Sequence, residues 1–252
     1  MSNVIKMPKA SKSTRPDKIF LLDQVVEKFS VLEAAIAGDL YYWIAKGEQP
    51  WRVVSDYSTW FEVNEKTIRL KIKNMDSAKF FNVTRTRMRS GSYGANKFSK
   101  SNSNSSKALF NGYTSLLNNE FEGKDFGEFD PNEPSYKEIP RFQMLFLETI
   151  HEVGDLKAAY LLDRICWAMN TRGQSSLYFR SVSHFAEWSN LDRKTAQRKL
   201  EYLETAGLLE SETTQTELVI NAYEESPAFF RFSTYIEDKE EARHEGIRES
   251  IA

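Results

Sequence analysis

The sequence predicts an α+β fold that is mainly α-helical with small β-hairpins, arranged as two similar domains in tandem. Residues 55–81 have the pattern of a short helix, a tight turn and a longer helix, and a hairpin-like segment follows. Residues 183–209 repeat this pattern at a constant offset of 128 positions. With 252 residues, 40% of them hydrophobic, the chain is long enough for two separate cores.

The longer helix of the first copy is apolar on one side and cationic on the other. Asn64 is suited to cap its start, and Ile68, Ile72 and Met75 recur at helical spacing. The opposite side carries Lys66, Leu70 and Lys73, with Thr67 and Arg69 on its flanks. A lone helix of this kind is most simply a solvated surface helix. A second copy of the same pattern in the chain favours a functional surface.

The second copy keeps both the apolar spacing and several identities of the first. Trp60 corresponds to Trp188 and Lys66-Thr67 to Lys194-Thr195. Upstream, a helix containing Leu32, Asp39 and Trp43 matches Leu156, Asp163 and Trp167 at an offset of 124. In the second copy Asp192 is the expected cap, Gly207 the expected stop, and Gln197 and Arg198 have side chains that pair with adenine and guanine edges.

A β-hairpin is predicted directly after each longer helix. Residues 82–89 alternate in strand fashion and place Arg85, Arg87 and Arg89 on one face, and residues 96–100 form the return strand with Lys97. The second hairpin, residues 210–219, is acidic where the first is basic. A hairpin in this position is the wing of a winged helix, so the fold prediction is two tandem winged helix-turn-helix domains.

Such a helix is suited to the DNA major groove, and wing arginines are suited to phosphate contacts. The predicted partner is therefore double-stranded DNA, with replication proteins or a second copy of the chain as further possible partners. The predicted DNA-binding residues are Lys66, Thr67, Arg69, Lys71, Lys73, Arg85, Arg87, Arg89, Lys97, Arg193, Lys194, Thr195, Gln197 and Arg198.

Charge is distributed unevenly, and this sets the predicted boundaries. Between residues 66 and 107 there are eleven Lys or Arg residues against one acidic residue, whereas residues 118–138 carry seven acidic and two basic residues. The Ser/Asn-rich stretch 99–107 is expected to be flexible. The predicted organisation is a disordered basic arm (1–17), a first winged-helix domain (18–117), an acidic linker (118–138), a second winged-helix domain (139–223) and a charged C-terminal tail helix (224–252).

No catalytic constellation is recognisable, and we expect no enzyme activity, no cofactor and no metal site. The three His residues are scattered, and the single Cys, Cys166, gives no zinc-ligand spacing. There is no phosphate-binding Gly-rich loop. The absence of long apolar segments and of a signal-like N-terminus predicts a cytoplasmic protein without a membrane span.

Several motifs resemble the winged-helix domains of plasmid and phage replication proteins. They are Ala34-Ala35, Tyr41-Tyr42-Trp43, Trp51, Trp60 and Lys66-Thr67-Ile68-Arg69 in the first copy, and Leu203 to Gly207-Leu208-Leu209 in the second. The resemblance covers both domains and implies an initiator that binds repeated origin sequences. A transcriptional repressor or partition protein of a mobile element is the alternative on the same fold. A third hypothesis is that one winged helix is a protein-interaction module that recruits replication machinery.

Overall fold

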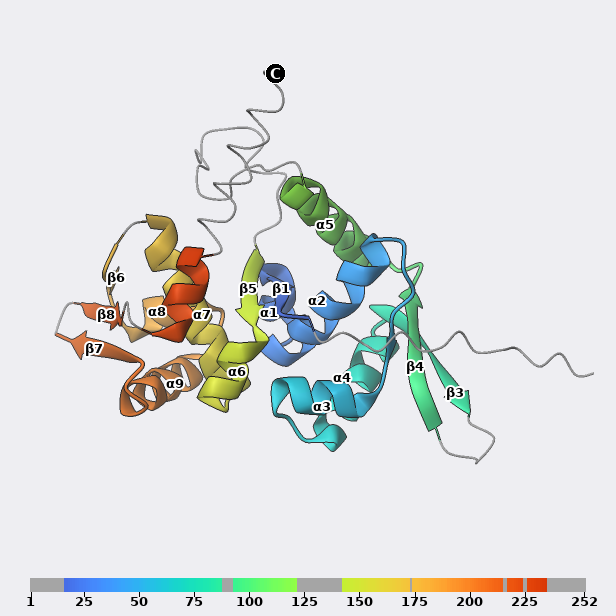
Figure 1. Cartoon of the computed structure of the whole chain (residues 1–252), viewed down its shortest axis with the longest axis horizontal. Coiled ribbons are helices and arrows are strands. Elements are labelled where there is room, and N and C mark those ends of the chain that lie inside the picture. The colour runs from blue at the N-terminus through green and yellow to red at the C-terminus, as the bar shows by residue number, and fades with distance from the viewer. Residues whose placement is uncertain are drawn as a thin grey trace, which may run out of the picture.

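The computed structural model describes residues 16–87, 93–121, 142–172, 174–214, 217–223 and 226–234. This part of the chain is mainly helical and contains three small antiparallel sheets (Figure 1). It consists of two units with the same order of elements, joined through a pair of strands. The predicted α+β character, with helices predominant, is therefore confirmed.

The first unit contains a three-stranded sheet of order β2-β4-β3. Its elements are β1 (Lys18–Leu22), α1 (Asp23–Lys28), α2 (Val31–Ala45), β2 (Trp51–Arg52), α3 (Val54–Phe61), α4 (Glu65–Ser77), β3 (Phe81–Arg87), β4 (Tyr93–Lys100) and α5 (Asn104–Phe121).

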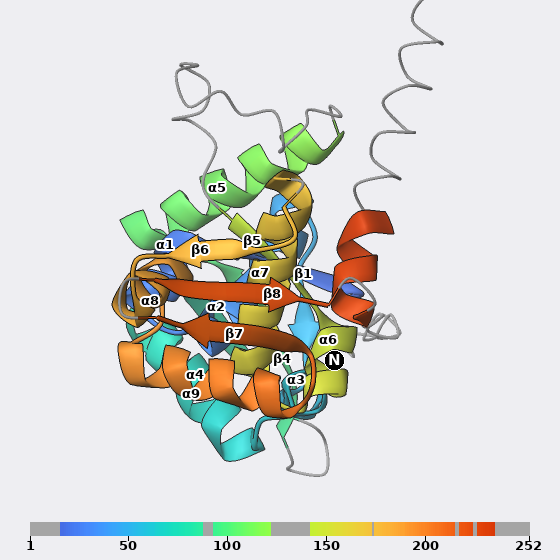
Figure 2. The ribbon, with the colours of Figure 1, turned by 90° about the vertical axis from the view of Figure 1, so that its left-hand side faces the viewer.

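The second unit repeats this order, and in its sheet β8 lies between β6 and β7 (Figure 2). Its elements are β5 (Phe142–Phe146), α6 (Leu147–Val153), α7 (Leu156–Arg172), β6 (Leu177–Phe179), α8 (Val182–Ser189), α9 (Arg193–Thr205), β7 (Leu209–Thr213) and β8 (Leu218–Ala222). A further helix covers residues 227–234.

Local backbone conformation repeats at the predicted offset of 128. The turn between the paired helices contains a left-handed residue in each unit, Glu62 with φ 52° and Asn190 with φ 55°. A second left-handed residue follows α4 and α9, namely Lys79 with φ 59° and Gly207 with φ 68°. These turns redirect the chain in the same way in both units, so the sequence repeat corresponds to a repeat of structure.

The helix caps predicted from the sequence are also present. The Asn64 side chain accepts a hydrogen bond from the backbone N–H of Lys66 at 2.8 Å. The Asp192 carboxylate accepts from the backbone N–H of Thr195 at 2.9 Å. Hydrogen bonds from Thr195 lower the pKa of Asp192, so this cap is ionised at neutral pH and suits the helix N-terminus.

The two units meet through an antiparallel strand pair that the sequence analysis did not predict. In the β1–β5 register Lys18 lies opposite Phe146, Phe20 opposite Met144 and Leu22 opposite Phe142. At the offset of 124 found for the upstream helices, Phe20 corresponds to Met144 itself. Each strand therefore pairs with its own counterpart in reverse, so an approximate local twofold axis passes through the Phe20–Met144 pair.

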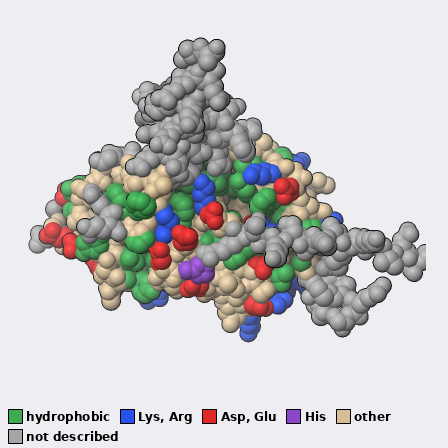
Figure 3. All heavy atoms as spheres, in the orientation of Figure 1, with side chains coloured by type: hydrophobic (Ala, Val, Ile, Leu, Met, Phe, Trp, Pro, Cys, Tyr) green, Lys and Arg blue, Asp and Glu red, His purple; other side chains and the backbone are tan. Residues whose placement is uncertain are grey.

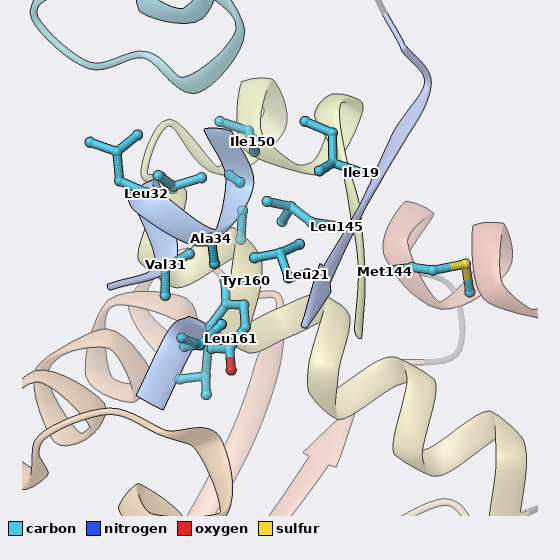
Figure 4. Packing of buried hydrophobic residues seen from close by; sticks show 14 of the residues in the cluster. Ile19, Leu21, Val31, Leu32, Ala34, Met144, Leu145, Ile150, Tyr160 and Leu161 are labelled. Carbon is cyan, nitrogen blue, oxygen red and sulfur yellow. The ribbon is translucent and has the colours of Figure 1, made fainter. Parts of the chain in front are cut away.

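Packing around this strand pair joins both units in one hydrophobic core. Buried Ile19 and Leu21 from β1 lie near Leu145 from β5 and Tyr160 from α7 (Figure 4). Gly38 allows α2 to approach β1 closely, because a Cβ atom at this position would lie 2.4 Å from the backbone oxygen of Phe20. The placement of β1 on α2 within the first unit is thus set by packed backbone as well as by side chains.

The prediction of a flexible Ser/Asn-rich stretch at 99–107 is wrong. Ser101 and Ser106 are buried, and Ser103 accepts from the backbone N–H of Ser106 at 3.1 Å, which caps the start of α5. The hydroxyls of Ser101 and Ser103 donate to the carbonyl of Lys79, so the serines attach α5 to the end of α4. Serine-rich composition reads as flexible, but here the hydroxyls satisfy exposed backbone groups.

Two predicted boundaries also move. Helix α5 runs to Phe121, beyond the predicted end of the first domain at 117; residues 122–141, most of the predicted linker, lie outside the described residues. Residues 227–234 belong to the second unit and not to a solvated tail, because Phe232 is fully buried and its ring lies 5.0 Å from that of Phe146. Residues 1–15 of the predicted arm and residues 235–252 are not described.

Candidate nucleic-acid interface

Helix α4 packs into the first unit with the apolar face that the sequence predicted. Ile68, Ile72 and Met75 are buried. The outward side carries five exposed side chains, in agreement with the prediction: Lys66, Thr67, Arg69, Leu70 and Lys73. Leu70 is 55% exposed in the middle of this otherwise polar surface.

Ion pairs divide the cations of α4 into two groups. Lys71 donates from Nζ to Glu33 Oε2 at 3.1 Å and is only 29% exposed, so it ties α4 to the start of α2. Arg69 donates to Glu65 one helical turn earlier at 2.7 Å, and both side chains stay largely exposed. Lys71, one of the predicted DNA-binding residues, is thus engaged in holding the helix in place, whereas Arg69 remains on the surface.

Helix α9 is placed in the same way. Ala196, Leu200 and Leu203 are buried, and Lys199 forms an ion pair with Asp155 just before α7. The two lysines are equivalent, since residues 71 and 199 differ by 128, but their acidic partners Glu33 and Asp155 do not occupy equivalent positions. The exposed predicted residues of α9 are Arg193, Lys194, Gln197 and Arg198.

Thr195 does not lie on this exposed side. It is only 8% exposed, whereas its counterpart Thr67 is exposed. The identical Lys-Thr pairs in the two copies concealed this difference. The prediction that Thr195 contacts DNA is therefore not met by its position in the structure.

The first hairpin places Arg85 on the side of the sheet that faces α4. Alternate residues of a strand share a face, and Phe81 and Val83, which precede Arg85 at intervals of two, pack into or against the core. The backbone N–H of Val83 also donates to Asp76 of α4 at 3.3 Å. Arg85 itself is exposed, so it adds a cation to the surface of the first unit outside the helix.

Of the other predicted cations of this hairpin, Lys97 is described with its side chain and Arg87 by its backbone alone. Lys97 lies opposite Thr84 and Trp51, with its ammonium 5.4 Å from the centre of the Trp51 ring, on the outer face of the sheet. The backbone of Arg87 belongs to β3, after a shift of register between Arg85 and Arg87. The side chain of Arg87 and the whole of Arg89 lie outside the described parts of the chain.

In the second hairpin the acidic residues lie on the face away from α9. Ser211 is the counterpart of Val83. It contacts α9, because its backbone N–H donates a hydrogen bond to the Glu204 carboxylate at 2.8 Å. Alternation then places Thr213 with Ser211, on the side facing α9, and Glu210 and Glu212 on the outer face. The surface beside α9 is therefore neutral at the hairpin, and Thr213 stands where the first unit has Arg85.

A buried ionic cluster positions the helix pair of the first unit. Asp39 of α2 accepts from Arg52 through both carboxylate oxygens, at 2.7 and 2.8 Å, and from the Tyr57 hydroxyl at 2.8 Å. The Asp39 and Arg52 side chains are 1% and 8% exposed. Burial raises the pKa of Tyr57 well above 10, so its hydroxyl stays protonated and donates. The cluster joins α2, β2 and α3, and so it fixes the position of the helix that precedes α4.

The counterpart of Asp39 has different partners in the second unit. Asp163 of α7 accepts from the backbone N–H of Phe146 at 2.8 Å and from the Thr149 hydroxyl at 2.9 Å. Full burial raises its pKa to about 7. Here the carboxylate holds β5 and α6 against α7.

Helices α4 and α9 lie towards the same side of the molecule. Figure 1 shows α4 and α9 along its lower side and the two hairpins towards opposite ends. Basic side chains are visible at this lower margin in Figure 3, interspersed with acidic ones. Contacts between α3 and α6 join the units near this side, where His151 Nδ1 lies 2.8 Å from Glu62 Oε1.

Comparison of the chain with protein-family models, with curated proteins and with solved structures gives no match. Within the described ranges, every helix is too short or too polar to cross a bilayer. The same ranges contain no cluster of three or more His, Cys, Asp or Glu side chains able to hold a metal ion.

Proposed function

We propose that this protein binds double-stranded DNA in a sequence-specific manner through two tandem winged-helix units. The single observation that carries the proposal is the duplication of one surface. Both α4 and α9 are anchored by a lysine ion pair on their inner side, expose polar and cationic side chains, and lie towards the same side of the molecule.

The order of elements supports the winged-helix part of the proposal. In each unit a short strand precedes the helix pair, and this strand is paired with the returning strand of the hairpin. The second helix of each pair leaves its outer face uncovered within the described residues, as a helix needs in order to enter the major groove. In this proposal α4 and α9 read two successive major grooves of one duplex.

The two units contribute differently to binding. The outward faces of α4 and α9 carry the same balance of charge: Glu65, Lys66, Arg69 and Lys73 on one, and Arg193, Lys194, Arg198 and Glu201 on the other. The hairpins differ, because Arg85 adds a cation beside α4 and Thr213 adds none beside α9. The first unit should therefore supply more phosphate contacts, and the second unit should depend more on base contacts.

The test begins with selection of bound sequences from a pool of random duplexes by the full-length protein, at low and at high salt. Arg198→Ala is expected to cost about 1–3 kcal/mol and to relax preference at one base pair. Arg85→Ala is expected to weaken binding to all sequences alike and to reduce the salt slope by about one unit. Lys107→Ala, at an exposed lysine of α5 that belongs to neither α4 nor α9, is the matched control and should change neither quantity.

Unchanged binding in both the Arg198 and the Arg85 variant would overturn the assignment of this surface. The genomic position of the protein's DNA target site would distinguish replication from transcriptional repression or partition. The resemblance to plasmid and phage replication proteins favours an origin, so we propose a replication initiator; a site at a promoter or a centromere-like locus would favour a repressor or a partition protein instead.

The outer face of the β6-β8-β7 sheet favours a second candidate function, that of a protein-interaction module. Tyr178 is 66% exposed there, and Val219 and Glu212 lie beside it in register. An apolar and acidic face of this kind is not suited to DNA. If the second unit serves only to bind protein, Arg198→Ala will leave the selected DNA motif unchanged, whereas Tyr178→Ala will abolish capture of the partner.

A further inference from the structure

The two candidate reading helices carry an apolar and a cationic side chain, respectively, at one equivalent position in the middle of their exposed faces. Leu70 of α4 and Arg198 of α9 are equivalent at the offset of 128. Both side chains are exposed, Leu70 at 55%. Neither has a role in packing its helix, because the buried faces of α4 and α9 are formed by other residues.

Neighbouring positions on these faces are more alike. Lys66 corresponds to Lys194, and both are exposed lysines in the first turn. Arg69 corresponds to Gln197, and each is held by a glutamate of its own helix, at 2.7 Å by Glu65 and at 3.0 Å by Glu201. Within this frame, the replacement of a leucine by an arginine puts an apolar side chain on one helix where the other helix has a donor of paired hydrogen bonds.

The approximate twofold axis determines how these positions meet a duplex. It passes through the Phe20–Met144 pair and exchanges β1 with β5, and the elements that follow these two strands come in the same order, up to α4 in one unit and α9 in the other. A twofold axis in a DNA-binding protein corresponds to inverted half-sites in its target. Residues 70 and 198 would therefore face equivalent base pairs in two half-sites of opposite direction.

The chemistry of the two side chains predicts different bases at these pairs. An arginine donates two hydrogen bonds to O6 and N7 of guanine, whereas an apolar side chain contacts the methyl group of thymine. We infer that the target is an imperfect inverted repeat, in which Leu70 selects a thymine at one position and Arg198 selects a guanine at the equivalent position of the other half. This inference rests on the proposed function and deepens it.

The experiment is selection from random duplexes with the full-length wild-type protein and with Leu70→Arg, Leu70→Ala and Arg198→Leu. The wild type should enrich two inverted motifs that differ at one equivalent pair. Leu70→Arg should change the thymine to guanine in the first motif only, with a preference of roughly ten-fold or more, and so make the two halves more alike. Leu70→Ala should reduce the thymine preference by about four-fold without creating another, since burial of about one methyl group is lost.

Arg198→Leu is the reciprocal change and should convert the guanine of the second motif to thymine. Thermal unfolding of each variant controls for folding, and the exposure of Leu70 predicts unchanged melting for both of its variants. A wild-type motif without inverted symmetry, or a motif that Leu70→Arg leaves unaltered, would overturn the inference while leaving DNA binding intact. Failure of the wild type to enrich any motif would overturn the proposed function and the inference together.

Discussion

Asp163 gives a prediction in which the sign of a pH effect tests the structure. Its carboxyl group is completely buried and accepts hydrogen bonds from Phe146 and Thr149. Burial raises its pKa from the ordinary 3.8 to about 7. The neutral form is therefore favoured in the folded protein, and the ionised form in the unfolded chain.

The direction in which stability changes with pH follows from linkage between protonation and folding. Between pH 4 and pH 7 the folded state binds more protons at this site than the unfolded state, so stability falls as the pH rises through this window. A difference of about 3 pKa units corresponds to about 4 kcal/mol at most, because one unit is worth about 1.4 kcal/mol. Asp163→Asn keeps the shape and an acceptor oxygen but cannot ionise, so it removes this loss.

The assay is urea unfolding of wild type and Asp163→Asn at several pH values from 4 to 8. The stability of the variant relative to wild type should increase by a few kcal/mol as the pH rises across the window. Asp192→Asn is the matched control, because the pKa of Asp192 is lowered and not raised. The stabilisation that ionised Asp192 gives is complete above pH 4 and is lost only below it. Parallel curves for wild type and Asp163→Asn would refute the buried, proton-retaining environment described for this group.

Two further changes test the scaffold beneath α4. Gly38→Ala should lower the free energy of unfolding by about 1–3 kcal/mol, measured in urea, because the new Cβ meets the Phe20 backbone oxygen at 2.4 Å; helix propensity alone predicts stabilisation, so a more stable variant would contradict the close approach of α2 to β1. Asp39→Ala should cost about 3–5 kcal/mol, because it leaves Arg52 charged and unpaired in the core. The double variant Asp39→Ala with Arg52→Met should recover part of that loss in guanidinium unfolding, and equal losses in the single and double variants would count against a buried ion pair.

Features determined by local sequence were largely predictable. The caps at Asn64 and Asp192 and the stop at Gly207 each follow from side-chain chemistry within a few residues. The apolar faces of α4 and α9 follow from helical periodicity in the same way. The exposed candidate site therefore follows from the sequence for most of its residues.

Features that depend on distant partners were not predictable. The segments that form β1 and β5 are each five residues long and apolar, and such runs read equally well as buried helix. Their pairing joins positions more than one hundred residues apart. The engagement of Lys71 with Glu33 and the burial of Thr195 likewise depend on packing against α2 and the second core, which periodicity within one helix does not reveal.

The central claim is that the two units form one DNA-binding surface. It is tested most directly by hydroxyl-radical footprinting of the full-length protein on a duplex obtained by selection. The account predicts two protected regions whose centres lie about one helical turn, roughly 10 base pairs, apart, with Arg198→Ala weakening one region preferentially. A single protected region, or equal protection at every position, would contradict it.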